Sequence, residues 1–453
     1  MRGGQNRQSY SRETQRKQIS VSKLNFAFLS VSGSPKFRFM PEQSTTKRAM
    51  FSRRHFLKTS GSAAVGVGGL ILSKAALAAD TLDLPFKNGE RSLVRFPQKR
   101  PLILLTTRPP QLETPFSVFN EGVFTPNDAF FVRYHLAQVP TSINPDTFRV
   151  AIKGKVNSAL ELSLEDIKTK FEPVEIAAVN QCSGNGRGFS TPRVAGGQLG
   201  NGAMGNAKWK GVRLKDVLTK AGLAATAKQV TFNGLDTPPV EKVPDFIKAL
   251  DIDQAIDDDT LLAYEMNGEP LPMLNGYPLR LILPGYYGTY WVKHVNEITV
   301  LDEPFSGFWM DPAYRIPDNS CACVEPGTPA KKTKPIARYN VRSFITSHSD
   351  GAKVQQNKSV SLRGIAFDGG YGITEVLLSE DGGQTWRATQ LGKDYGKYSF
   401  REWTASFTPR KSGELQLKVK ATNRIGQSQP LEALWNPAGY MRNLVETTRL
   451  IAS

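Results

Sequence analysis

The chain has 453 residues, of which 40% are hydrophobic and 22% charged; this is an ordinary globular composition, long enough for two or three domains. The formal net charge is +17, but residues 1–50 contribute +8 of it and residues 51–79 another +4, which leaves only +5 for the remainder. No run of Lys or Arg and no nucleic-acid-binding motif accompanies this mild charge, so the composition argues against nucleic-acid binding.

The basic N-terminal part is typical of an export leader. Paired arginines in SRRHFLKTSG (52–61) precede a weakly apolar stretch and a small-residue cleavage signature, ALA, at 76–78. This order is typical of a twin-arginine signal peptide, whose apolar core is too short and too glycine-rich to span a membrane. We therefore expect a signal at 50–78, translation from Met50, and export to the periplasm with no membrane span after signal removal. Residues 1–49 are then a mis-assigned extension, the alternative being a disordered arm.

Residues 79–325 mix strand and helix patterns. FFVRYHL (130–136) and FRVAIKG (148–154) are typical of strands, and the apolar run YPLRLILPG (277–285) is typical of a buried strand. A helix is predicted to start in LSLEDIKTKF (162–171), where Ser and Asp are spaced as a capping box. A second helix is predicted in GVRLKDVLTKAGL (211–223), with its apolar residues on one face and a stop at its glycine.

The pattern changes after a Pro- and Lys-rich linker at 326–335. Apolar residues then alternate with polar ones, as in ELQLKVKATN (414–423), and a hairpin is predicted around the Asp-Gly-Gly turn of residues 373–391. Six or seven short strands predict an Ig-like β-sandwich over 336–453. The expected fold class is α+β: a mixed α/β domain over 79–325, followed by an all-β sandwich.

Cysteine is scarce. Cys321 and Cys323 are too closely spaced for an unstrained bridge, whereas a bridge from Cys182 to either of them is possible from the sequence. No Cys-x-x-Cys-His motif occurs, so no c-type haem is expected on this chain. Only three histidines follow the signal, so zinc or iron sites of the usual His/Cys kind are poorly supplied.

Cys182 lies in a glycine-rich loop, VNQCSGNGRGFSTPRVAGGQLGNGAMG (179–205). A lone cysteine in such a loop is either a buried structural residue or a thiolate presented to a metal or substrate, with glycines that allow close backbone approach. Other polar residues also interrupt apolar or glycine-rich context. Each has an ordinary structural explanation alone, but together they supply fixed cations and a phenol: Arg133, His135, Arg187, Asp236, Asn275, Arg280, Lys293, Tyr314 and Arg315.

From about residue 100 to the C-terminus, the chain resembles the sulfite oxidase family of molybdopterin enzymes, in particular the molybdenum subunit of bacterial periplasmic sulfite dehydrogenases. The resemblance rests on collinear motifs: FFVRYHL, NQCSGNGRG, GNAKWKGVRLKDVL, LAYEMNGEPLP, GYPLRLILPGYYGTYWVKHVNEITV, FWMDPAYRIPDN and WNPAGYMRN. It implies a sulfite-oxidase-type molybdopterin domain followed by a dimerisation-type β-sandwich.

The resemblance also implies roles for individual residues. Cys182 is expected to be the single protein ligand to molybdenum, with the pterin dithiolene and oxo groups completing the coordination. The substrate pocket is expected to contain Arg133, His135, Arg187 and Tyr314. Cofactor contacts are expected from Tyr134, His135, Asp236, Asn275, Arg280 and Lys293. At the position of Asn275 the animal enzymes of the family have a histidine. His294, next to Lys293, can be either a cofactor contact or a structural histidine.

The implied reaction is oxidation of sulfite to sulfate. We see neither a cytochrome b5-like domain nor a haem motif, so a separate c-type cytochrome is expected to accept the electrons, and the C-terminal domain is expected to form a homodimer. Three alternatives remain from the sequence. They are the sulfane dehydrogenase subunit of the thiosulfate-oxidising system, a methionine-sulfoxide reductase, which usually lacks the β-cap, and a non-catalytic binding protein on the same scaffold.

Overall fold

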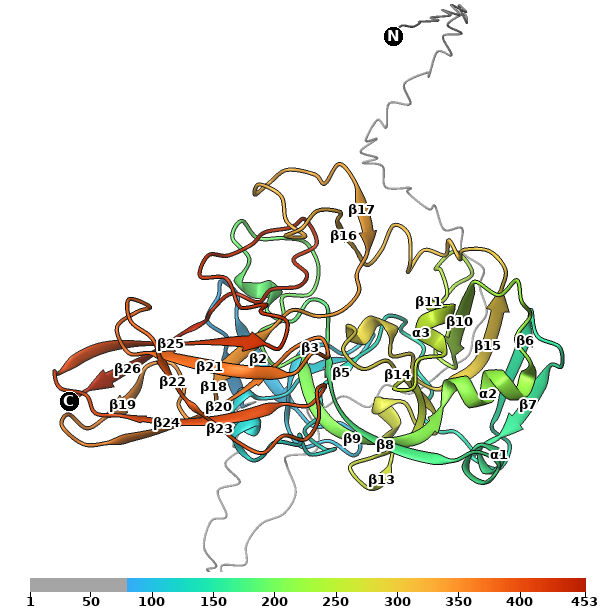
Figure 1. The fold of residues 1–453 in the computed structure, drawn as a ribbon, viewed down its shortest axis with the longest axis horizontal. Helices are drawn as coiled ribbons and strands as arrows, with labels where there is room; N and C mark the ends of the chain where they lie inside the picture. The colour runs from blue at the N-terminus through green and yellow to red at the C-terminus, as the bar shows by residue number, and fades with distance from the viewer. Residues whose placement is uncertain (1–79) are drawn as a thin grey trace, which may run out of the picture. The chain divides into compact units, whose positions relative to one another are not determined.

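The computed structural model describes residues 80–453 (Figure 1). The predicted extension and signal peptide lie outside this range. The described chain is mostly β, and its helices are short: α1 (Leu164–Lys170), α2 (Leu214–Ala221), α3 (Ile252–Ala255) and the 3-10 turns η1 (Phe116–Asn120), η2 (Arg187–Phe189), η3 (Met273–Asn275) and η4 (Gly288–Tyr290). None of the helices within 80–453 combines the length and the apolar character needed to cross a bilayer.

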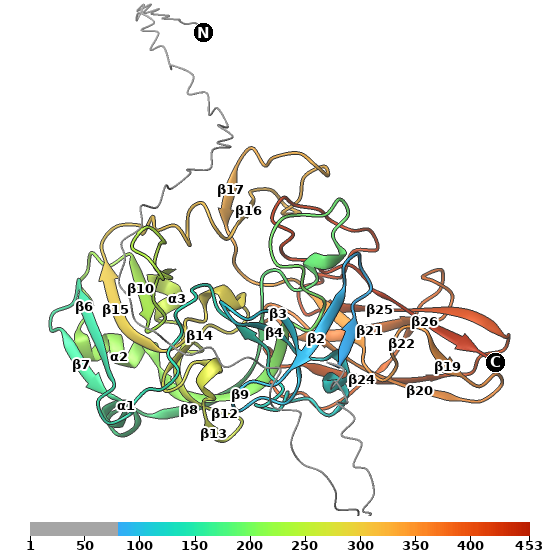
Figure 2. The ribbon, with the colours of Figure 1, turned by 180° about the vertical axis from the view of Figure 1, so that it is seen from behind.

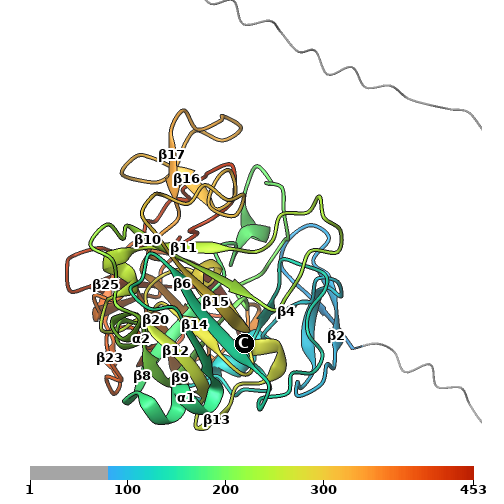
Figure 3. The same cartoon turned by 90° about the vertical axis from the view of Figure 1, so that its right-hand side faces the viewer.

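One sheet, formed by strands within residues 149–301, has the order β11-β10-β15-β6-β7. Figure 3 shows β6, β15 and β10 side by side. Only the β15–β6 pair within it is parallel. The predicted strand at 148–154 and the capping box of the first helix are both confirmed. The strands are β11 (Lys248–Asp251), β10 (Gln229–Gly234), β15 (Val295–Leu301), β6 (Arg149–Gly154) and β7 (Leu160–Ser163).

A second sheet has the order β13-β12-β9-β8, with β14 paired to β12. The long antiparallel pair of β8 and β9 brings the two ends of the glycine-rich loop together, because Gln181 lies opposite Met204. Helix α2 follows β9 directly and buries its apolar face as predicted, ending at Gly222. The strands are β13 (Glu269–Pro270), β12 (Leu261–Met266), β9 (Met204–Arg213), β8 (Pro173–Gln181) and β14 (Arg280–Ile282). The buried strand predicted at 277–285 is therefore shorter, three residues long.

The N-terminal sheet has the order β1-β2-β3-β4-β5, and Figure 2 labels its strands β2, β3 and β4. The strand predicted over 130–136 is wrong in length, because only Val132 and Arg133 pair, with the edge of β4. The side chains that follow leave the sheet to line a cavity, so backbone pairing stops there. The strands are β1 (Thr81–Asp83), β2 (Glu90–Val94), β3 (Leu102–Thr106), β4 (Gln111–Glu113) and β5 (Val132–Arg133).

Residues 342–452 form two sheets, β18-β20-β24-β23 and β19-β26-β25-β21-β22. The predicted hairpin is confirmed by the β21–β22 pairing, and β25 buries alternate residues. The described strands number nine rather than six or seven, because two-residue edge strands escape pattern analysis. They are β18 (Arg342–Ile345), β19 (Ala352–Val354), β20 (Val360–Phe367), β21 (Ile373–Ser379), β22 (Arg387–Ala388), β23 (Gln390–Leu391), β24 (Arg401–Phe407), β25 (Gly413–Asn423) and β26 (Thr447–Ala452).

The hydrophobic core does not stop at the linker. The largest buried cluster extends from the sheets before the linker into the C-terminal part through Phe344, Phe367 and Phe400. A second cluster fills the space between the two C-terminal sheets. The segment between the two parts is partly ordered by pairing, since β16 (Arg315–Pro317) pairs with β17 (Thr333–Pro335). The C-terminal sheets therefore share a hydrophobic core with the sheets that precede the linker.

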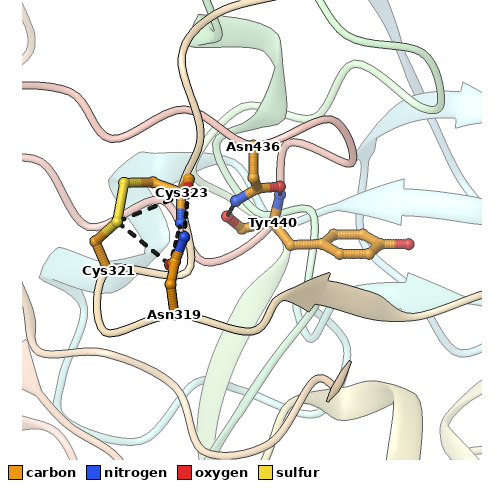
Figure 4. The surroundings of a disulfide bond; sticks show 5 residues. All are labelled: Asn319, Cys321, Cys323, Asn436 and Tyr440. Atoms are coloured by element: carbon orange, nitrogen blue, oxygen red, sulfur yellow. Dashed lines mark hydrogen bonds between the residues drawn. A yellow bond between two sulfur atoms is a disulfide. The ribbon is translucent and has the colours of Figure 1, made fainter. Parts of the chain in front are cut away.

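The expectation for the cysteines is wrong. Cys321 and Cys323 form a disulfide (Figure 4). Cys182 is free and buried. The physical reason is the backbone of Ala322, whose φ of 51° turns the chain and leaves the two cysteine Cα atoms 5.1 Å apart, within the usual range for a disulfide. Spacing alone did not reveal this turn.

Candidate functional site

A cavity lies among the loops that follow β5, β8, β10 and β14. Eight of the predicted site residues line it: Cys182, Arg133, Tyr134, His135, Asp236, Arg280, Lys293 and Tyr314. They come from segments up to 181 residues apart in the sequence, so the fold alone brings them together. Two predicted residues, Asn275 and Arg187, are not part of the lining.

Cys182 follows the last residue of β8, and its backbone N donates to the carbonyl of Ala203 (2.9 Å). Its side chain faces the cavity, and 9% of the residue is exposed. Gly288 closes the same wall, where a Cβ atom would lie only 2.3 Å from Asn180 Oδ1. A side chain there would displace the Asn180 amide and would lie 3.2 Å from the carbonyl of Gln181, the last residue of β8.

Two cations line the cavity, the buried Arg280 and the half-buried Lys293. Lys293 Nζ donates to the carbonyl of Arg133 (2.6 Å) and lies 4.3 Å from the centre of the Tyr134 ring. Arg280 Nη1 donates to the carbonyl of Asn275 (2.9 Å), and its guanidinium packs against two tryptophan rings. Burial lowers the pKa of Arg280 to about 9 and, with the help of Arg280, lowers that of Lys293. An anion bound between them would raise both pKa values again.

Asp236 is the single carboxylate among the lining residues, against the three cations Arg133, Arg280 and Lys293. Burial raises the pKa of Asp236 above its ordinary value, and the charge of Lys293 opposes that shift. The cavity therefore carries surplus positive charge in a desolvated setting, which favours an anionic ligand.

His135 and Tyr314 form a hydrogen-bonded pair at the cavity wall, through His135 Nε2 and the tyrosine hydroxyl. The imidazole stacks on Phe246 at a centroid distance of 3.8 Å. Burial lowers the pKa of His135, and the neighbouring Arg133 lowers it further, while burial raises the pKa of Tyr314. Both groups are therefore neutral near pH 7, and either one can be the donor of the hydrogen bond between them without a change in net charge.

His294 has a structural position. Its Nε2 lies 2.6 Å from the hydroxyl of Tyr134, and its Nδ1 lies 2.5 Å from the carbonyl of Tyr277. A carbonyl only accepts, so Nδ1 carries the proton and Nε2 accepts from the hydroxyl. Burial lowers the pKa of His294 to about 3, in keeping with a neutral ring. The histidine fixes the ring of Tyr134, which lines the cavity.

Asn275 lies behind the cavity wall. Its Oδ1 accepts from Lys99 Nζ (2.5 Å), its Nδ2 donates to the carbonyl of Phe131 (3.1 Å), and its own carbonyl holds Arg280. The side chain is thus engaged by protein groups on both ends, which makes it a support for Arg280. Lys99 was not found from the sequence, because a single lysine in a loop carries no signal of burial.

Arg187 also lies outside the lining. Its Nε donates to the carbonyl of Ala438 (2.9 Å), and its guanidinium lies 5.0 Å from the centre of the Tyr440 ring. The Tyr440 ring in turn stacks on Tyr314, at 5.5 Å between centroids and 6° between planes. Sequence analysis gave the C-terminal part no site residue, but Tyr440 links Arg187 to the cavity wall. The quoted motif WNPAGYMRN contained it, without a pattern that marked it.

Lys248 is a further buried cation that sequence analysis missed. Its Nζ donates to the carbonyl of Trp309 (2.5 Å) and lies 5.2 Å from the centre of the Tyr314 ring. Only 1% of the residue is exposed, and burial lowers its pKa to about 7. It supports the loop that carries Tyr314.

The lining also holds polar atoms that fit a ligand rich in donors and acceptors. Four buried atoms have no hydrogen-bond partner within the described part of the chain: Asn180 Oδ1, Ser183 Oγ, Arg280 Nε and Thr289 Oγ1. No cluster of three or more His, Cys, Asp or Glu side chains suited to a metal occurs among residues 80–453. A metal at Cys182 therefore needs ligands from a cofactor, and a thiolate suits a sulfur-rich metal centre.

Comparison with known proteins agrees with this geometry. Residues 135–309 match the oxidoreductase molybdopterin binding domain, and residues 333–448 match the Mo-co oxidoreductase dimerisation domain. Sulfite oxidase of Gallus gallus is 30% identical over 391 residues, which cover 83% of this chain and 82% of that protein. The chain belongs to the sulfite oxidase family. Its cofactor is molybdenum–molybdopterin, and the orphaned polar atoms and surplus positive charge of the cavity fit that group.

Other similarities extend the comparison. Mitochondrial sulfite oxidase of Macaca fascicularis is 34% identical over 364 residues, which cover 77% of this chain but only 65% of the macaque protein. The crystal structure of the sulfane dehydrogenase SoxCD from Paracoccus pantotrophus has the same fold, with a TM-score of 0.64 at 22% identity over 85% of this chain and 93% of that one.

Proposed function

We propose that the chain is the molybdenum subunit of a periplasmic sulfite dehydrogenase, which oxidises sulfite to sulfate and passes electrons to a c-type cytochrome. The observation that carries this proposal is the cavity itself, where the thiol of Cys182 faces surplus positive charge from Arg133, Arg280 and Lys293. A small dianion is the substrate class that such a cavity favours, since arginine keeps its charge and binds oxyanions in a planar, bidentate manner.

The cofactor, when bound, supplies oxygen transfer to the substrate sulfur and receives two electrons. Arg280 and Lys293 would hold its phosphate, and Cys182 would hold the metal. Asp236 and Tyr134 lie on the same wall and would orient the pterin. Ser183 and Thr289 offer hydroxyls that lack other partners within the described residues.

The remaining lining residues act on the substrate. Arg133 would bind a sulfite oxygen by charge-assisted hydrogen bonds. Neutral His135 accepts or donates at Tyr314, so the tyrosine hydroxyl can turn toward the substrate without a change in net charge. Arg187 lies outside the lining, held by Ala438 and Tyr440, and its positive charge acts on Tyr314.

Periplasmic location rests on the twin-arginine signature, and the acceptor rests on the resemblance to dehydrogenases that pair with a separate cytochrome. The match of residues 333–448 to a dimerisation domain supports a homodimer through the C-terminal sheets.

The test is turnover of purified, molybdenum-loaded protein with sulfite and an oxidised c-type cytochrome. We expect sulfate and reduced cytochrome, and slow reaction with molecular oxygen. Fast oxygen reduction would identify an oxidase instead. Turnover of a protein-bound sulfane sulfur, with free sulfite inert, would favour the sulfane dehydrogenase alternative.

A further inference from the structure

The loop between β16 and β17 carries a disulfide that the proposed reaction does not use. Cys321 is exposed and Cys323 is half-buried, and neither lines the cavity. Asn319 closes the base of the loop, donating from Nδ2 to the carbonyl of Cys323 (2.7 Å) and accepting from its backbone N (3.2 Å) (Figure 4). Cys321, which carries one of the two sulfurs, is therefore an exposed residue, while the hydrogen bonds of Asn319 hold the backbone at Cys323.

This loop contacts the turn that carries Tyr440. The backbone N of Val324 donates to the carbonyl of Trp435 (2.9 Å). The next residue, Asn436, holds Tyr440 through Nδ2 to its carbonyl (2.8 Å) and Oδ1 to its backbone N (3.1 Å), as Figure 4 shows. Tyr440 then stacks on Tyr314 and lies under the Arg187 guanidinium. Contacts therefore run from the disulfide loop to the substrate side of the cavity.

Disulfides are opened by soft sulfur nucleophiles, through attack on one sulfur and departure of the other as a thiolate. Sulfite is such a nucleophile, and it is the substrate proposed for this chain. The connection between β16 and β17 contains two acidic residues, Asp318 and Glu325, and two basic ones, Lys331 and Lys332, so no net formal charge opposes the approach of a dianion.

We propose that the Cys321–Cys323 disulfide is a second, covalent site for sulfite, which leaves an S-sulfonate on Cys321. The sulfite sulfur supplies the electron pair for the new bond to Cys321 Sγ. The pair of the broken S–S bond leaves with Cys323 Sγ as a thiolate. The charge is two negative units before and after, and no oxidant or reductant is needed.

The step is reversible, because the thiolate of Cys323 is only two residues away and can expel sulfite again. Opening the loop adds negative charge and frees the Val324 segment beside Trp435. The turn with Tyr440 then loses part of its support, which raises the KM for sulfite at the cavity. This consequence rests on the proposed function, whereas formation of the S-sulfonate does not.

The test treats the holoenzyme with increasing sulfite, traps free thiols with iodoacetamide, and maps the peptides by mass spectrometry. We expect the peptide with both cysteines to gain one sulfite, placed on Cys321, and one carbamidomethyl group on Cys323. Iodoacetamide alone and sulfate at equal ionic strength are the controls, and the Cys321→Ser/Cys323→Ser variant should gain nothing. An intact disulfide at sulfite concentrations that saturate turnover would overturn the proposal.

A second measurement tests the consequence. The trapped enzyme, freed of excess reagent, should show a severalfold higher KM for sulfite than enzyme treated with iodoacetamide alone. An unchanged KM would refute the link through Tyr440. A chain that gains sulfite at Cys321 but does not oxidise sulfite would uphold this site and refute the proposed function instead.

Discussion

Tyr440→Ala tests whether the C-terminal part helps to build the substrate side of the cavity. Tyr440 stacks on Tyr314 at 5.5 Å, and its ring centre lies 5.0 Å from the Arg187 guanidinium. A stacked aromatic pair contributes about 0.5–1.5 kcal/mol, and a desolvated cation–π contact contributes up to about 2 kcal/mol. The substitution therefore removes roughly 1–3 kcal/mol of the free energy that holds Arg187 and Tyr314 in position.

The assay is steady-state sulfite oxidation by molybdenum-loaded protein. If about 1.4 kcal/mol of the loss falls on substrate binding, the KM for sulfite rises about tenfold. Tyr440→Phe keeps both ring contacts and should stay close to the wild-type KM. A wild-type KM for Tyr440→Ala at full molybdenum content would refute the claim that Tyr440 positions Arg187.

Four further changes test the account. Cys182→Ser should keep the fold, by circular dichroism, but lose activity, because a hydroxyl is a hard replacement for a soft thiolate; near-wild-type activity at full molybdenum content would remove Cys182 as the ligand. Arg133→Gln should raise the KM for sulfite sharply, since each lost charge-assisted bond costs about 1.5–3 kcal/mol; unchanged saturation would place Arg133 outside the pocket. Burial lowers the pKa of His294 from 6.5 to about 3. Between these two pH values the unfolded chain binds a proton at His294 and the folded chain does not, so the free energy of unfolding falls as the pH drops from 6.5 to about 3. Urea unfolding at several pH values should show a shallower fall for His294→Gln, and equal slopes would contradict the assignment. Haem reduction in stopped flow should slow as salt rises if the cytochrome contact is transient and polar, whereas a stable cytochrome subunit would show little salt dependence.

Local patterns predicted the elements whose signals are local. The capping box of α1, the apolar face of α2 and the alternation in β25 depend on residues a few positions apart, and all three were correct. The strand over 130–136 was too long because apolar and aromatic residues suit a buried wall as well as a strand. There Tyr134 and His135 line a cavity instead of continuing the sheet beyond Arg133.

Site residues that belong to a recognisable motif could be predicted from the sequence, whereas those buried only by tertiary packing could not. The resemblance named Cys182 and Lys293, which the structure places in one cavity. Lys99 and Lys248 carry no sequence signal, because burial of a lysine depends on which distant elements cover it. The Cys321–Cys323 disulfide was not predicted for a related reason, because residue spacing does not reveal the backbone turn at Ala322.

The central claim is that Cys182 and the surrounding cations form a molybdenum site that oxidises sulfite with one-electron transfer to a cytochrome. The most direct measurement mixes molybdenum-loaded protein with sulfite and oxidised c-type cytochrome, and counts sulfate formed against haem reduced. We expect one sulfate for every two haems reduced, and no sulfate from the Cys182→Ser chain. Fully loaded wild-type protein that leaves sulfite unchanged would contradict it.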